Sequence, residues 1–424
     1  MSDIHNGFQD ALEESRERRR KRRRMAALIL GGLVLGGWLL TRFTPVFETP
    51  GPRLERQTAE LPPTESGLDV LRKIPWPSPA PDGNGGFEQW VEDHRVVYTL
   101  DAELQQQALA VLQRYDVYYG ALVAVEPATG RILALAEYSR QEPEITDFCR
   151  RATYPAASIV KVITAVGALE TGGVTPDTPV RFEGSPYRLY PRKVDPANRR
   201  RENNVHTLAE ALGRSNNVVF GKVGADVLGA DGLQAVLDRF GFNGPIPFDF
   251  RLQESTATVP AERYPLARAA AGFGEVYLSP VHAALVAAAV GNRGLMMRPF
   301  VVDSIEDHNG DVVYRAIPAP FRQCTTPEVA TQVAEMMTQT VSSGTSAKIF
   351  YKYARKLRRK VGVAGKTGSL TGSDPPGKYE WFVGFAPVQE PQIAVASLIV
   401  NRGDLWHIKG TYMAQAVMRE FFGM

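Results

Sequence analysis

The sequence predicts an α/β protein of the α+β type: an antiparallel sheet flanked by helices, with an inserted all-helical lobe, preceded by a single transmembrane helix. Three observations lead to this prediction. An apolar run without charge lies near the N-terminus, as in a membrane span. Two apolar segments around a short turn predict a β-hairpin. Three strand patterns near the C-terminus are separated from that hairpin by a series of helical patterns, which predicts one sheet packed against helices.

The N-terminal region predicts a basic tail and a membrane anchor. Residues 1–24 hold eight Lys/Arg and five Asp/Glu, and the next sixteen residues contain neither a charge nor a proline. Sixteen helical residues span about 24 Å, less than the ~30 Å hydrocarbon core, so we expect the span to cover residues 25–45, with Arg42 reaching the far interface. Thr41-Arg42-Phe43 is a poor signal-peptidase site, so we expect a retained anchor rather than a cleaved signal peptide.

This charge distribution also predicts the orientation of the chain. Eight basic residues precede the span and one follows it, so the N-terminus is expected in the cytoplasm. The rest of the chain then lies outside a cytoplasmic (inner) membrane that it crosses once, in a periplasm or in the extracellular space. We expect residues 46–95 to be a linker, because nine of the 30 prolines lie in residues 45–81 and Gly83-Asn84-Gly85-Gly86 follows. The folded domain is predicted over residues 96–424.

Composition excludes several classes of function. After residue 24 the chain holds 41 basic and 41 acidic residues, so a broad nucleic-acid-binding surface is not expected. Cys149 and Cys324 are too few for a disulfide-rich scaffold or a cysteine-based zinc site. They either form one disulfide or remain two separate buried thiols, and both readings stay open. The six histidines show no metal-ligand spacing, and no metal or other cofactor is expected.

The predicted elements follow from local patterns. Asp101 is a candidate N-cap for a helix whose apolar face runs from Leu104 to Tyr115. The predicted hairpin pairs Ala121–Glu126 with Arg131–Ala136. Further helices are predicted at Ser158–Glu170, Thr207–Arg214, Gly229–Phe240, Pro280–Val290 and Pro327–Val341, then strands at Val361–Gly368, Glu380–Ala386 and Gln392–Val400, and a closing helix at Met413–Phe422.

Three short motifs carry candidate chemistry. They are Ser158-Ile159-Val160-Lys161 (SxxK), Ser215-Asn216-Asn217 (SxN) and Lys366-Thr367-Gly368 (KTG). On a helix, Ser158 and Lys161 share a face at about 5–6 Å between Cβ atoms. A lysine can activate a serine only when it is neutral, which requires its pKa to fall by about three units from about 10.4. A helix start, burial and a second lysine such as Lys366 all lower the pKa.

The KTG segment suits a strand that binds an extended peptide. Gly362, Gly365 and Gly368 would let a peptide lie against an edge strand, and Lys366 with Thr367 could hold a carboxylate. The same segment comes close to a phosphate-binding loop. Residue 360 is Lys where that motif requires glycine, so we reject a nucleotide site.

Together the three motifs resemble those of the penicillin-binding proteins, specifically their transpeptidase domain, in the serine acyltransferase group that includes the serine β-lactamases. The resemblance extends over about 330 residues, from Val97 to the end. It also includes segments outside the trio: Thr99-Leu100-Asp101, Gly120–Gly130, Gly272-Phe273-Gly274, Ser279-Pro280, Asn292-Arg293-Gly294, Gly344-Thr345 and Trp381–Pro387.

The resemblance implies a β-lactamase/transpeptidase-like fold and a role for each motif residue. Ser158 would be the acylated nucleophile and Lys161 its general base. Ser215 would relay a proton to the leaving amine, and Asn217 would hold the substrate amide. The remaining implied site residues are Lys366 and Thr367, which bind the terminal carboxylate, Gly368 of the same motif, and Ser369, whose N–H forms the oxyanion hole with that of Ser158.

The implied substrate is a peptidoglycan stem peptide ending in D-Ala–D-Ala, whose acyl group passes to an amine on a neighbouring strand. β-Lactams would acylate the same serine. Some details depart from the family pattern: Ala156-Ala157 stand where Pro-Gly usually precedes the serine, Ser369 replaces Thr, and Phe273 replaces a common Gln. Residues 48–95 are too short for a glycosyltransferase domain, so we expect a monofunctional enzyme whose partners include the membrane and a separate glycosyltransferase.

Other functions remain as alternatives. The same site with water as acceptor would be a D,D-carboxypeptidase or a β-lactamase, although the sequence has no E-x-x-L-N segment to supply a deacylating carboxylate. A non-catalytic β-lactam-binding scaffold is an alternative of another class, although Ser158 and Lys161 are both present. Basic stretches at residues 188–201 and 348–360 are either solvated surface or attract an anionic polymer or partner.

Overall fold

The computed structural model describes residues 65–75, 80–402 and 408–424. The predicted basic tail (1–24) and transmembrane helix (25–45) lie outside the described residues. Among the described residues, no helix is both long and apolar enough to cross a bilayer.

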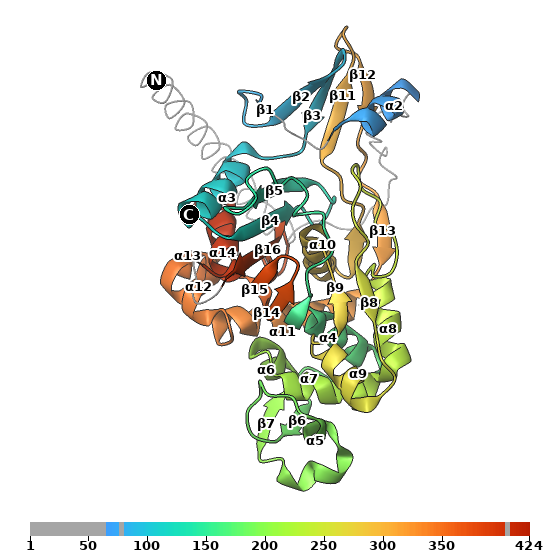
Figure 1. Cartoon of the computed structure of the whole chain (residues 1–424), viewed down its shortest axis with the longest axis vertical. Coiled ribbons are helices and arrows are strands. Elements are labelled where there is room, and N and C mark those ends of the chain that lie inside the picture. Colours follow the sequence, from blue (N-terminus) through green and yellow to red (C-terminus); the bar gives the residue numbers. More distant parts are fainter. Residues whose placement is uncertain (1–64, 76–79, 403–407) are drawn as a thin grey trace, which may run out of the picture. The chain divides into compact units, whose positions relative to one another are not determined.

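A five-stranded antiparallel sheet forms the centre of the structure (Figure 1). Its strands, in spatial order, are β14 (Ala364–Ser373), β15 (Pro376–Ala386), β16 (Ile393–Asn401), β4 (Tyr119–Val125) and β5 (Ile132–Tyr138). Strands β4 and β5 are the predicted hairpin, and β14 to β16 are the three predicted C-terminal strands. Because β14 lies at an edge of this sheet, no other strand in the described part of the chain covers one side of the strand that carries the KTG motif.

Both faces of the sheet are buried. Along β4, Ala121 and Val123 belong to one apolar cluster and Leu122 and Ala124 to the other, as expected when successive side chains point to opposite faces. Helices α3 (Ala102–Arg114) and α14 (Gly410–Phe421) cover one face, and α10 (Pro280–Gly291) covers the other. The predicted N-cap is confirmed, since the Asp101 side chain accepts hydrogen bonds from Glu103 N and Leu104 N.

The inserted lobe is not all-helical as predicted. Its helices include α4 (Val160–Glu170), α6 (Leu208–Gly213), α7 (Asn217–Val223), α8 (Gly229–Arg239) and α9 (Arg263–Ala270). It also contains two small sheets, in which β6 (Pro179–Phe182) pairs with β7 (Asn204–Thr207) and β8 (Thr256–Thr258) pairs with β9 (Glu275–Tyr277). Each of these strands has only three or four residues, and its partner lies about 20 residues away, so no local turn signal marked the pairing.

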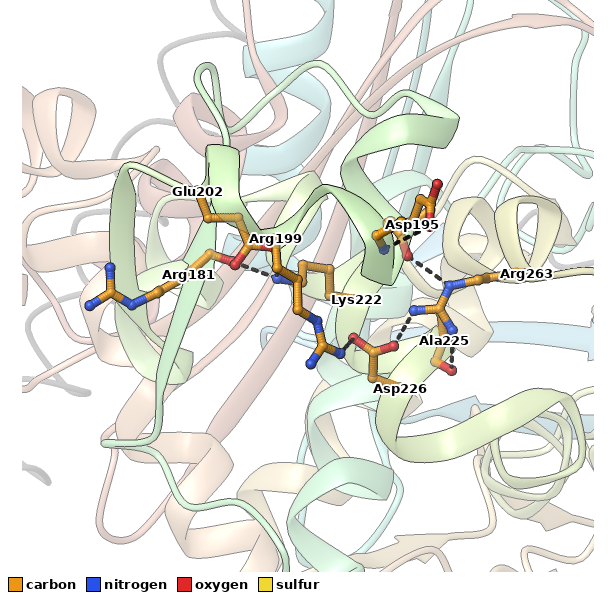
Figure 2. A network of polar contacts seen from close by, with 10 residues as sticks. Arg181, Asp195, Arg199, Glu202, Lys222, Ala225, Asp226 and Arg263 are labelled. Atoms are coloured by element: carbon orange, nitrogen blue, oxygen red, sulfur yellow. Dashed lines mark hydrogen bonds and ion pairs between the residues drawn. The ribbon is translucent and has the colours of Figure 1, made fainter.

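Ion pairs and hydrogen bonds tie the segment between β6 and β7 to the helices of the lobe (Figure 2). Lys222 Nζ, on α7, donates to Glu202 Oε1 at 2.6 Å and to the Arg181 carbonyl oxygen at 2.8 Å. Asp226 binds Arg263, whose Nε donates to the Val194 carbonyl oxygen at 2.7 Å. This network fixes a loop that runs beside the SxN motif.

A second antiparallel sheet includes part of the predicted linker. Its order is β1 (Ala80–Pro81), β2 (Phe87–Val91), β3 (His94–Tyr98), β11 (Val302–Glu306) and β12 (Val312–Arg315). Helix α2 (Glu65–Lys73) packs on β12, where a Cβ on Gly67 would lie 2.3 Å from the Val313 carbonyl oxygen. The predicted linker of residues 46–95 therefore contains a helix and two strands, and the fold begins before residue 96. Strands β2 and β3 form a hairpin across Glu92 and Asp93, and β3 pairs on its other side with β11, about 200 residues later in the chain, which no local pattern reveals.

The remaining elements complete the unit. Helix α4 starts at Val160, two residues later than predicted, because a 3₁₀ turn occupies Ala157–Ile159.

Cys149 and Cys324 are both buried and free, so the reading as two separate thiols is confirmed. The other elements are α5 (Pro191–Val194), 3₁₀ turn Pro196–Arg201, π-turn Gly224–Leu228, β10 (Leu295–Met297), β13 (Pro320–Gln323), α11 (Pro327–Ser342), α12 (Ala347–Tyr353) and α13 (Arg355–Lys360).

Candidate active site

Ser158 and Lys161 meet at the N-terminal end of α4. The serine lies in the 3₁₀ turn, and the lysine, in the first turn of α4, is fully buried. Lys161 Nζ lies 2.6 Å from Ser158 Oγ. It also donates hydrogen bonds to Asn217 Oδ1 and to the Ala271 carbonyl oxygen, both at 2.7 Å.

These contacts match a neutral amine. A neutral lysine has two N–H donors and one lone pair, and two of the three contacts are to oxygens that can only accept. The third contact is Ser158 Oγ, which can donate its proton to the lone pair. Burial, and then the charge of Lys366, lower the pKa of Lys161 well below its usual value. The site therefore holds a base directly beside the serine.

The SxN motif, which lies in the inserted lobe, faces Ser158 and Lys161. Asn216 is the N-cap of α7, and its side-chain oxygen accepts hydrogen bonds from Val218 N and Val219 N. This cap starts the helix at Asn217, whose Oδ1 faces Lys161. Asn217 Nδ2 donates to the Tyr187 carbonyl oxygen at 2.7 Å, which fixes the orientation of the amide. One N–H of that amide remains for a ligand.

Lys366 joins the KTG strand to the SxN motif. It is fully buried on β14, and its Nζ donates to Ser215 Oγ at 2.9 Å and to the Thr367 carbonyl oxygen at 2.7 Å. Burial lowers the pKa of Lys366 to about 7. This lysine can therefore be charged or neutral near neutral pH, and it can hold a carboxylate or pass a proton to Ser215.

The rest of the KTG segment lies against the serine turn. A Cβ on Gly368 would come within 3.3 Å of Ala157 Cβ, so the glycine lets β14 approach the turn closely. Thr367 Oγ1 lies 2.6 Å from Thr345 Oγ1, an exposed pair of hydroxyls at the end of the site that the resemblance predicts to bind a carboxylate. The Ser369 hydroxyl instead donates to Glu380 Oε2 at 2.9 Å, so its predicted contribution rests on its backbone N–H alone.

The structure thus brings the three motifs together through two linked contact sets. One joins Ser158, Lys161 and Asn217, and the other joins Ser215, Lys366 and Thr367. Sequence reasoning did not assign three groups that complete the site: the carbonyl oxygens of Ala271 and Tyr187, and the Thr345 hydroxyl. The Ala271 carbonyl oxygen had a signal in the sequence, because the next residue is Gly272. That glycine has φ +89°, and a Cβ there would lie 2.0 Å from the Ala157 carbonyl oxygen.

A cleft of about 610 Å³ opens beside the serine turn. It lies between the segment that precedes the turn, the C-terminal half of β14, and α9 with β9. Its lining residues include Thr153, Phe273, Tyr277, Leu370 and Ser373. An extended ligand bound along β14 with its terminal carboxylate near Thr367 would direct its other end into this cleft.

Comparison with known proteins agrees with the site. Residues 120–423 match the model of the "penicillin binding protein transpeptidase domain". A peptidoglycan D,D-transpeptidase PbpA of Mycolicibacterium smegmatis is 28% identical over 370 residues, covering 76% of this chain and 70% of that protein. The D,D-transpeptidase domain of a peptidoglycan glycosyltransferase from Eggerthella lenta superimposes with a TM-score of 0.65 at 29% identity, covering 77% of this chain and 82% of that one.

A second solved structure is an acyl-enzyme complex. Penicillin-binding protein A of Mycobacterium tuberculosis, bound to ceftriaxone as an acyl-enzyme, superimposes with a TM-score of 0.62 at 26% identity, over 76% of this chain and 79% of that one. The matched residues include all three motifs and the whole inserted lobe. With its serine, buried lysines and edge strand arranged as described, the chain belongs to the penicillin-binding protein transpeptidase domain family.

Proposed function

We propose that this chain is a peptidoglycan D,D-transpeptidase that cross-links stem peptides through an acyl-enzyme on Ser158 and is inhibited covalently by β-lactams. The contact between Ser158 Oγ and Lys161 Nζ carries the proposal, because it pairs a hydroxyl with a buried amine of lowered pKa. Two findings support it: relatives are named peptidoglycan D,D-transpeptidases, and a related structure is a β-lactam acyl-enzyme.

Acylation then follows from the contacts. Ser158 Oγ attacks the carbonyl carbon of the penultimate D-Ala while Lys161 accepts the hydroxyl proton. The Oγ–C bond forms and the C–N bond to the last D-Ala breaks. Ser215 passes a proton to the leaving amine, and an acceptor amine later reverses these steps to form the cross-link. Lys366 and Thr367 hold the terminal carboxylate, and the N–H groups of Ser158 and Ser369 stabilise the oxyanion.

The setting of the enzyme is part of the proposal. We infer that residues 25–45 anchor the chain once in the cytoplasmic membrane, with residues 1–24 inside and the catalytic domain in the periplasm or extracellular space. The excess of basic residues before the apolar run supports this orientation. A separate glycosyltransferase would supply the glycan strands.

Intact-protein mass spectrometry tests the activity. The 424-residue chain in detergent and its Ser158→Ala variant are incubated with benzylpenicillin. We expect one stable adduct of the drug's mass on the wild type and none on the variant. Rapid loss of penicillin without an adduct would identify a β-lactamase. Neither an adduct nor loss of the drug would overturn the catalytic assignment in favour of a scaffold.

A further inference from the structure

Helices α12 and α13 carry a concentrated positive charge. Seven basic residues and no acidic one lie between Ala347 and Lys360, and no Asp or Glu occurs from residue 336 to residue 373. The residues that we call the cationic surface are Lys348, Lys352, Arg355, Lys356, Arg358, Arg359 and Lys360.

The fold presents these side chains to solvent. Phe350 and Leu357 are completely buried and anchor the two helices to the apolar cluster that includes α14. Six of the seven basic residues are exposed, and Arg358 is half-buried. Tyr351 is 53% exposed, and the Arg358 guanidinium lies 4.2 Å from the centroid of its ring. Helices α12 and α13 are therefore held to the fold by buried side chains, and their basic side chains extend into solvent.

No anion of the described residues neutralises this surface. None of the seven basic side chains forms an ion pair within the described part of the chain, whereas on the lobe Arg192 binds Glu183 at 3.3 Å and Arg199 binds Asp226 at 3.8 Å. Like charges at this density repel one another. Because these basic side chains have no acidic neighbours to pair with among the described residues, the cationic surface is suited to bind a separate anionic molecule.

Both ends of the cationic surface lie close in the chain to residues of the active site. Helix α12 begins two residues after Thr345, whose hydroxyl lies 2.6 Å from that of Thr367. Helix α13 ends six residues before Lys366. Under the proposed function, this end of the site binds the terminal carboxylate of the donor. The acceptor amine must take the place of the D-Ala that leaves there, at the end of the site from which α12 and α13 are only a few residues away in the chain.

We propose that the cationic surface binds the carboxylates of the acceptor peptidoglycan strand and so favours its amine over water. This inference rests on the proposed function. In the step it assists, the acceptor nitrogen attacks the ester carbonyl carbon of the Ser158 acyl-enzyme. The N–C bond forms, the Oγ–C bond breaks, and a proton from the amine returns to Ser158 Oγ. Water competes for the same ester, and an acceptor held nearby has a higher effective concentration.

Binding of peptidoglycan tests the surface. The variant Arg355→Gln/Lys356→Gln/Arg359→Gln is compared, in the 424-residue chain, with Arg188→Gln/Arg200→Gln/Arg201→Gln, which removes the same charge from exposed positions on the lobe. We expect co-sedimentation with uncross-linked peptidoglycan at low salt to fall about tenfold in the first variant and little in the second. High salt should weaken wild-type binding, and so should amidation of the peptidoglycan carboxyl groups.

Turnover gives a second readout. With a peptidoglycan acceptor, the ratio of aminolysis to hydrolysis should fall in the α13 variant, whereas with glycinamide as acceptor all three proteins should give the same ratio. Acylation by benzylpenicillin and the unfolding midpoint should be equal in all three, which separates this inference from the proposed function. Equal peptidoglycan binding by the two variants would overturn it. So would loss of binding to phosphatidylglycerol vesicles with peptidoglycan binding unchanged, which would assign the surface to lipid.

Discussion

Lys161 Nζ donates a hydrogen bond to Asn217 Oδ1 at 2.7 Å, and this contact uses a neutral amide where a carboxylate would bind more strongly. An amide accepts the hydrogen bond without adding a charge. It therefore fixes the direction of the amine and leaves the lowered pKa of Lys161 intact. The choice of Asn over Asp at this position is a condition for base catalysis by the lysine.

The variant Asn217→Asp should convert this contact into an ion pair. The new carboxylate would raise the pKa of Lys161 toward its usual value of about 10.4, so at pH 7 acylation by penicillin should fall on the order of 100- to 1000-fold. Acylation should then recover about tenfold per pH unit between pH 7 and pH 9. Asn217→Ala is the matched control, since it removes the amide without adding charge: its rate should fall without this steep pH dependence. Equal pH profiles for the two variants would contradict the argument.

Lys366 should give folding stability a specific pH dependence. Its pKa in the folded protein is about 7, below the value of about 10.4 expected in the unfolded chain. Between these values the unfolded state binds a proton that the folded state does not, so the free energy of unfolding rises with pH, by up to about 1.4 kcal/mol per unit. Lys161, with its lowered pKa, acts in the same direction.

The variant Lys366→Met isolates this contribution. Below pH 7 the wild type buries a charged lysine, and the variant does not. We therefore expect the wild-type unfolding midpoint to rise more steeply than that of the variant between pH 7 and pH 9.5, as measured by thermal denaturation of the 424-residue chain. Parallel curves for the two proteins would show that Lys366 is not neutral in the folded state at high pH.

Local sequence patterns were sufficient for the sheet and for the motif residues. The hairpin, the N-cap at Asp101 and the three C-terminal strands each have a signal within a few residues, and the structure contains all of them. In two of the predicted motifs, local helix geometry places the residues relative to one another. SxxK spans one helical turn, and Asn216 of SxN caps the helix that begins at Asn217. These short segments were therefore enough to predict the motif residues of the site.

Features that depend on long-range contacts could not be predicted in this way. The second partner of β3 is β11, about 200 residues later, so no local pattern showed that the hairpin of β2 and β3, which lies mostly in the predicted linker, continues into a sheet. The second acceptor for Lys161 is the Ala271 carbonyl oxygen, 110 residues away and without a side chain to signal it. The lack of ion pairs around α12 and α13, within the described part of the chain, likewise depends on what the fold brings near them, which charge counting alone cannot show.

Replacing Ala157 with glycine should stabilise the folded protein. It has φ +49°, in the left-handed region that a residue with a Cβ rarely adopts. Glycine there would relieve strain of about 1–2 kcal/mol and lose about 0.4–1 kcal/mol through the entropy of the unfolded chain. Ala157→Gly should therefore stabilise the protein by about 0.5–1 kcal/mol in denaturant unfolding, with penicillin acylation retained.

The neighbouring residue provides the matched control for this change. Ala156 has φ −64° and ψ −21°, an ordinary right-handed conformation. Ala156→Gly should gain no relief of strain and should destabilise the protein by about 0.4–1 kcal/mol. If both substitutions lower stability to the same extent, the strain at residue 157 is absent.

Gly272 should be required for the position of the serine turn. A Cβ at this position would lie 2.0 Å from the Ala157 carbonyl oxygen and 2.9 Å from Ser158 N, and the residue has φ +89°. In Gly272→Ala the turn must therefore move, which also displaces the neighbouring Ala271 carbonyl oxygen from Lys161. We expect penicillin acylation to fall by about 100-fold or more, because an error of about 1 Å in placing reacting groups has an effect of this size.

Gly184→Ala is the matched control for the substitution at Gly272. Gly184 also has positive φ, +60°, but a Cβ there would meet no atom of the described residues within 4 Å. This variant should lose only about 0.5–1 kcal/mol in stability, the difference between the backbone strain and the lower entropy of the unfolded chain, and keep its acylation rate. A Gly272→Ala protein that acylates at the wild-type rate would show that the close approach of residue 272 does not position Ser158.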